Sequence, residues 1–132
     1  MRPLPAFGIP TYAVLGNHDY GMKAKDVRPN TALAAKLVES LEAVGVQVLK
    51  NEAVTLVPPQ NQSRTSARSD RNTLLYLVGI GSHWANEDQP AVALAEIPNS
   101  APKFVMMHHP ESFVVLPANT APVAVAGHTH GG

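Results

Sequence analysis

The sequence contains no cysteine among its 132 residues, which excludes disulfides, thiolate metal sites and cysteine nucleophiles. It also lacks an excess of charge of either sign, since Lys plus Arg and Asp plus Glu both number 10. A nucleic-acid-binding patch is therefore not expected, because such proteins usually carry a basic excess. The longest apolar run, residues 74–80, is far shorter than the roughly 20 residues that cross a bilayer. The chain as given is therefore predicted to be soluble and cytoplasmic, without a membrane segment, although a longer parent would be free to carry a membrane anchor or an export signal.

What the sequence does contain is typical of a folded protein. Apolar residues make up 45% of it and charged residues 15%, a balance that favours a globular chain over a disordered one. A chain of this length suffices for one compact domain with one hydrophobic core. Because no linker or internal repeat is visible, residues 1–132 are expected to form a single domain.

Strands and helices are predicted to alternate along the chain. A helix begins at Asn30 or Thr31, has apolar side chains at helical spacing and ends at Gly45. A second helix is expected after Asp88 as its N-cap, with Pro90 in the first turn. Short apolar runs predict strands at residues 11–15, 46–49, 53–57, 73–79, 103–107 and 123–126.

This alternation predicts an α/β fold in which helices cover a sheet, because several strands are apolar on both faces. The second helix is expected to bury Val92, Leu94 and Ile97. The polar stretch at residues 58–72 is interpreted as a solvated hairpin loop rather than a phosphate-binding arm.

Five of the six histidines lie in three polar clusters, each directly after an apolar run. The clusters are Gly-Asn-His-Asp at residues 16–19, His-His-Pro at residues 108–110 and Gly-His-Thr-His-Gly-Gly at residues 127–132. Loops at the carboxyl ends of strands commonly display ligand-binding groups in α/β folds. Imidazole nitrogen and amide oxygen are suitable ligands for a divalent metal. The joint pattern therefore predicts a metal site, although each cluster alone also fits an ordinary turn or strand end.

The ordered set of three clusters resembles the calcineurin-like metallophosphoesterases, and more narrowly the small bacterial phosphodiesterase-like proteins whose last motif reads Gly-His-Thr-His-Gly-Gly. The resemblance runs over nearly the whole chain. It implies a layered α/β/β/α sandwich, of which this chain would be the carboxy-terminal portion. It also implies a dinuclear site of divalent metal ions, with manganese, iron or zinc expected, and a phosphomonoester or phosphodiester substrate.

The same resemblance implies a role for each matching residue. Asn17, His108 and His128 would bind the second metal, and His130 would bind the first. His18 would stabilise the phosphoryl group or protonate the leaving group, and Asp19 would orient it. His109 falls at a variable position of the family motif.

The sequence departs from the family at its start. Family members open with an Asp-x-His motif and a Gly-Asp motif, whereas the first acidic residue here is Asp19. The bridging carboxylate is therefore missing, and the site of the first metal is expected to be incomplete. A truncated gene product, a misplaced start and an excised piece would each explain this loss. The exposed sheet edges that follow from such a loss predict a homo-oligomer.

Two functions remain open at the level of sequence. The first is a metal-dependent phosphoester hydrolase that uses a metal-activated hydroxide. The alternative is a catalytically inactive homologue that serves as a binding or oligomerising module. Neither the substrate nor the metal is determined by the sequence. His83, which follows the strand at residues 73–79, is interpreted as a loop histidine packed by Trp84.

Overall fold

The computed structural model describes residues 4–56 and 74–130. The elements in chain order are the 3-10 helix η1 (Leu4–Phe7), β1 (Thr11–Ala13), the 3-10 helix η2 (Asn17–Tyr20), α1 (Thr31–Ala43), β2 (Val46–Val48), β3 (Glu52–Leu56), β4 (Leu75–Gly79), α2 (Pro90–Leu94), β5 (Lys103–Met107), the 3-10 helix η3 (Pro110–Phe113) and β6 (Val123–Ala126). The predicted loop at residues 58–72 lies outside the described residues.

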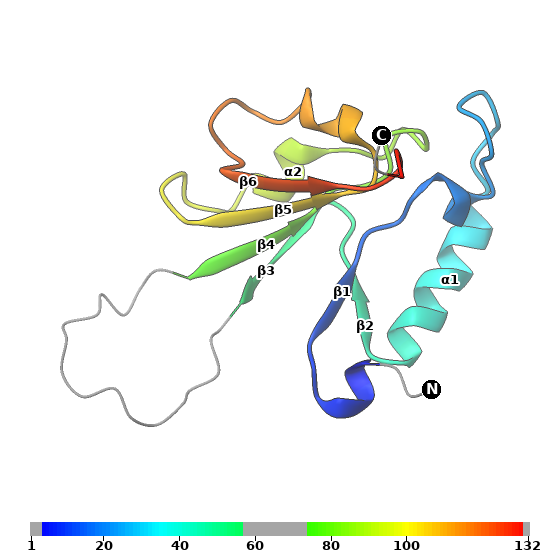
Figure 1. Ribbon diagram of the computed structural model, residues 1–132, viewed down its shortest axis with the longest axis horizontal. Coiled ribbons are helices and arrows are strands. Elements are labelled where there is room, and N and C mark those ends of the chain that lie inside the picture. Colours follow the sequence, from blue (N-terminus) through cyan, green and yellow to red (C-terminus); the bar gives the residue numbers. More distant parts are fainter. Residues whose placement is uncertain (1–3, 57–73, 131–132) are drawn as a thin grey trace.

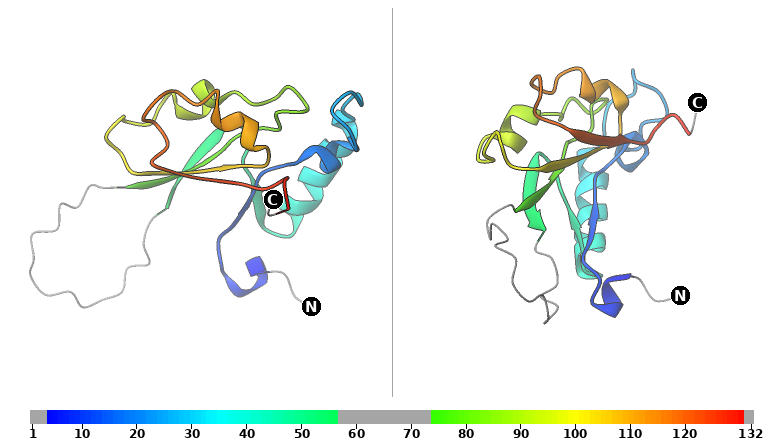
Figure 2. Two further views of the ribbon diagram at one scale, coloured as in Figure 1. Left: turned by 45° about the horizontal axis from the view of Figure 1, so that its top comes forward. Right: turned by 60° about the vertical axis from the view of Figure 1, so that its left-hand side comes forward.

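The strands form two sheets, each with a helix beside it (Figure 1). In the small sheet β1 pairs in parallel with β2, and α1 lies on the side facing away from the larger sheet. The larger sheet has the order β3-β4-β5-β6, with β3 antiparallel to β4 and the other neighbours parallel. Figure 2 shows α2 and η3 against the larger sheet. The α/β fold predicted from the sequence is confirmed.

The first helix agrees closely with the prediction. The side chain of Asn30 accepts a hydrogen bond of 3.0 Å from the Leu33 amide and so caps α1. Gly45 follows the helix with a φ of +85°, the left-handed conformation that glycine adopts without steric cost. Two of the apolar residues at helical spacing, Leu33 and Val44, are exposed. Burial is concentrated at Ala34 in the first turn of α1.

Two expectations about the second helix were wrong. The N-cap of α2 is Gln89, not Asp88, and no side chain caps it. Asp88 instead pairs with His83 at 2.7 Å and accepts a hydrogen bond of 3.1 Å from Ser112. These tertiary partners outweigh a local capping bond. Val92 is 60% exposed, because this short helix buries only the face that carries Pro90 and Ala93.

The two sheets meet where β4 ends. A Cβ on Gly79 would lie 2.3 Å from the Leu49 Cβ and 3.0 Å from a methyl carbon of Val14, so only glycine permits this approach. The contact brings the carboxyl end of β1 next to the carboxyl ends of the larger sheet's parallel strands. Within the described ranges, no helix is long and apolar enough to cross a membrane.

Candidate metal centre

The loop after β1 fixes Asn17 in one orientation. Its side chain is 2% exposed, and its Nδ2 donates a hydrogen bond of 2.8 Å to the Met22 carbonyl. This bond identifies Nδ2 as the nitrogen, so the carbonyl oxygen Oδ1 faces the other way. The 3-10 turn η2 holds the loop in shape, because the Asp19 carboxylate accepts a 2.7 Å hydrogen bond from the Gly16 amide.

His108 follows β5 and lies directly over Gly16. A Cβ on Gly16 would lie 2.6 Å from Nε2 of the imidazole, so the absence of a side chain there creates the space for the ring. The amide of Gly127 donates a 3.0 Å hydrogen bond to the His108 carbonyl, which ties the loop after β6 to the loop after β5. The three clusters found in the sequence therefore converge at one edge of the fold.

Three potential ligand atoms point at one another at this edge. Asn17 Oδ1 lies 3.1 Å from His108 Nε2 and 3.1 Å from His128 Nδ1, and the two nitrogens are 3.3 Å apart. Four ligand atoms around a tetrahedral cation, at bond lengths of about 2.0–2.1 Å, lie about 3.3 Å from one another. The donor set and its spacing therefore fit a divalent metal without rearrangement.

The loop after β6 reaches this position through a bent backbone. His128 and His130 have φ values of +68° and +55°, and the Thr129 amide donates a 2.8 Å hydrogen bond to the Gly127 carbonyl. His128 joins the close group of ligand atoms, whereas His130 is exposed and lies outside it. His130 is still near enough to lower the pKa of His108 by charge repulsion.

The two residues predicted to be catalytic lie on the same turn as Asn17. His18 on η2 is exposed, and the neighbouring Asp19 is partly buried. The hydrogen bond that Asp19 accepts comes from Gly16 within the turn. Their roles stay predictions, as do the metal-ligand roles of Asn17, His108, His128 and His130.

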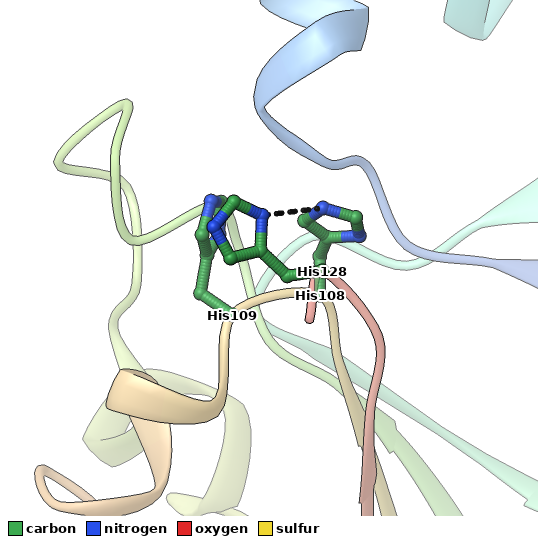
Figure 3. Close-up of side chains that lie close together, drawn as sticks. All are labelled: His108, His109 and His128. Carbon is green, nitrogen blue, oxygen red and sulfur yellow. Dashed lines mark hydrogen bonds between the residues drawn. The ribbon is translucent and has the colours of Figure 1, made fainter. Parts of the chain in front are cut away.

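The structure places a further histidine in this cluster, His109, which falls at a variable position of the family motif. His109 is 0% exposed, and its ring stacks on Trp84 at a centroid distance of 5.3 Å. His108, His109 and His128 offer ligand atoms that all lie within 4.8 Å of one another (Figure 3). Residues of β5 alternate between buried and partly exposed from Lys103 to Met107, and His109 continues the buried face beyond the strand, whereas the charged Lys103 on that face hides this signal in the sequence.

Burial and charge repulsion lower the pKa of His108 and of His109, which favours the neutral imidazole that binds metal. Desolvation lowers the pKa of His108, and the nearby His128 lowers it further, while the Asp19 charge opposes the shift. Desolvation lowers the pKa of His109 to about 4, with repulsion from His108 and His128 as the next causes. Protons therefore compete weakly for His108 and His109 at neutral pH.

His83 has a different neighbour from the one expected. Its ring bonds to Asp88 at 2.7 Å and lies 6.4 Å from the His109 ring centroid. The indole of Trp84 packs instead on His109 and, edge-on, on His128 at 4.6 Å. The single tryptophan thus forms one wall of the histidine cluster.

Comparison with known proteins assigns the chain to a family. The family model described as calcineurin-like phosphoesterase matches residues 1–132. Phosphodiesterase YaeI of Escherichia coli (strain K12) is 32% identical over 124 residues, which cover 93% of this chain and 37% of YaeI. The chain thus spans little more than a third of that relative's length. No solved structure gave a significant match. The chain belongs to the calcineurin-like phosphoesterase family.

Proposed function

We propose that this chain binds divalent metal and hydrolyses phosphomonoester or phosphodiester bonds. The observation that carries the proposal is the convergence of Asn17 Oδ1, His108 Nε2 and His128 Nδ1 at separations of 3.1–3.3 Å. Family membership supports the same class of reaction, and the relative that the chain matches is named a phosphodiesterase. His130 is proposed as the ligand of a neighbouring first metal, so that the complete centre is dinuclear.

Each residue of the site has a proposed role. Asn17 keeps its oxygen toward the metal because its nitrogen is held by Met22. His108 and His128 supply imidazole nitrogens. A bound divalent cation would offset charge on the phosphoryl oxygens and lower the pKa of a water so that hydroxide attacks phosphorus. His18 would then give a proton to the leaving oxygen, and Asp19 would keep the turn that carries His18 in place.

The proposal is tested by hydrolysis of bis(p-nitrophenyl) phosphate with added manganese. We expect slow turnover that a chelator abolishes and that Asn17→Ala removes. The rate is expected to be low because, among the described residues, His130 is the one ligand proposed for the first metal. Losing one member of a group of residues that act together lowers the rate by orders of magnitude. Rapid turnover that depends on Asn17 would contradict the expected rate, and would show that a partner chain supplies the missing ligands.

A second function, an inactive module that associates through its sheet edge, is favoured by a different observation. β6 is the last strand of the larger sheet, and Val123 and Val125 on it are 51% and 45% exposed. An apolar groove of about 480 Å³ beside it is lined by Met107, Pro110, Phe113, Ala121, Pro122, Ala124, Val125 and Ala126. An unpaired apolar edge is a template for pairing with another strand.

We therefore propose that two copies of this chain associate along β6. Light scattering across a dilution series from high micromolar concentration is expected to show a dimer that Val125→Lys converts to a monomer. Val92→Lys, at a similarly exposed valine on α2, is the matched control and is expected to leave the dimer intact. A wild-type monomer at every concentration would refute the association. No hydrolysis and no metal binding in a stable dimer would favour the inactive module over the enzyme.

A further inference from the structure

His109 stands out among the buried polar groups of the described residues because neither ring nitrogen has a hydrogen-bond partner. The side chain is 0% exposed. Leaving a buried donor or acceptor unsatisfied costs about 1–3 kcal/mol, so native proteins nearly always provide a partner. An apolar ring of similar shape would fill the same space without this cost. The presence of an imidazole here therefore calls for a partner.

The surroundings of the ring restrict what that partner is. One face of His109 stacks on Trp84, with an interplanar angle of 27°. The His128 and His108 rings lie 4.6 and 4.8 Å from it, centroid to centroid. Figure 3 shows the His109 ring beside the His128 ring. Two imidazoles that already aim nitrogens at a common point thus form its polar neighbourhood.

We propose that His109 is a further metal ligand, which joins His108, His128 and Asn17 around a single cation of the zinc type. The proposal rests on the proposed function only in using the same cluster. The ligand atoms of the three imidazoles lie within 4.8 Å of one another, whereas a tetrahedral site needs about 3.3 Å. A ring movement of roughly 1.5 Å closes this difference.

This assignment gives one of the two metals of the proposed centre four ligands from the chain's own residues. Three imidazoles and an amide oxygen make four protein ligands, the number of a tetrahedral zinc site, and expansion to five-coordination would leave a position for water. All four are neutral, so the bound cation keeps its full charge, which favours an anionic ligand such as a phosphate ester nearby.

His109→Phe tests the assignment, because phenylalanine keeps the stacking on Trp84 and removes both nitrogens. Zinc affinity is measured by competition with a chelating dye, and coordination by the visible spectrum of the cobalt-loaded protein. We expect the variant to bind zinc at least about 100-fold more weakly, a larger loss than the roughly 10–100-fold cost of an outer-shell change. The intense cobalt bands of a four-coordinate site should weaken. The Tm of the metal-free variant should be unchanged or higher.

His83→Gln is the matched control, since His83 lies 6.4 Å from His109 but outside the cluster of ligand atoms. It is expected to leave zinc affinity within a few-fold of wild type. If His109→Phe does not fold, nitrogen NMR of cadmium-loaded wild-type protein counts the imidazoles coupled to the metal. Coupling assigned to the His109 ring supports the proposal, and coupling that leaves out His109 overturns it.

The outcomes separate this proposal from the proposed function. Equal zinc affinity and equal cobalt spectra for wild type and His109→Phe would show that His109 is only a buried ring. Suppose that His109→Phe weakens zinc binding and that the wild-type protein hydrolyses no phosphate ester. This result would support His109 as a ligand and refute the proposed hydrolase activity. A wild-type chain that binds no zinc, cobalt or cadmium would overturn both.

Discussion

Replacing Gly16 by alanine is expected to weaken metal binding by about 100-fold or more while the protein still folds. The added Cβ would lie 2.6 Å from His108 Nε2 and 2.7 Å from two ring carbons, which is closer than any van der Waals contact permits. The backbone itself accepts alanine, since Gly16 has a φ of −106°. The imidazole is partly exposed and can swing outward, so strain is relieved by moving the ligand. Losing a ligand lowers metal affinity by more than the roughly 10–100-fold that an outer-shell change costs.

The measurement is a zinc titration of the variant beside a thermal denaturation of its metal-free form. Gly127→Ala is the graded control, because its Cβ would lie 3.4 Å from His108 Nδ1, which is an ordinary contact. We expect that control to stay within about tenfold of the wild-type affinity, less than the loss of a ligand costs. Wild-type zinc affinity in Gly16→Ala would mean that His108 does not bind the metal through Nε2.

His18→Ala is expected to reduce the rate of phosphoester hydrolysis by about 10²–10⁴, the usual contribution of a general acid. Metal affinity should not change, because His18 is exposed on η2 and lies outside the cluster of ligand atoms. The loss should be greatest for substrates with a poor leaving group. A nitrophenolate leaves without a proton, whereas an alkoxide needs one.

The experiment compares kcat/KM for an alkyl ester and a nitrophenyl ester of the same phosphate, with zinc affinity measured in parallel. His83→Gln is the matched control, since it replaces another partly exposed loop histidine that the proposed reaction does not use. An equal loss on both substrates would assign His18 to phosphoryl binding rather than to proton donation. No loss of rate on either substrate would show that His18 takes no part in the reaction.

Sequence patterns predicted those features of the molecule that depend on near neighbours in the chain. The cap of α1 is an example, because Asn30 bonds to the Leu33 amide only three residues away. The strands at residues 103–107 and 123–126 were predicted with their observed bounds. The His or Gly that directly follows each apolar run marks the end of the strand. The three polar clusters were recognisable for the same reason.

Longer-range features followed only from the tertiary structure. Asp88 reads as a helix cap in the sequence, yet it bonds to Ser112, which lies 24 residues further on. The choice of Nε2 on His108 and Nδ1 on His128 depends on an Asn17 oxygen 91 and 111 residues away. No local pattern fixes which ring nitrogen faces a distant atom.

The sequence by itself determined that this chain is an α/β protein of the calcineurin-like phosphoesterase family, because short apolar runs and the histidine clusters behind them are local signals. The tertiary structure decided which of those histidines meet. It placed His128 in the cluster and His130 outside it, since the bent backbone after β6 aims the two side chains differently. It also buried His109 against Trp84, because that contact exists only when the loops after β4 and β5 come together.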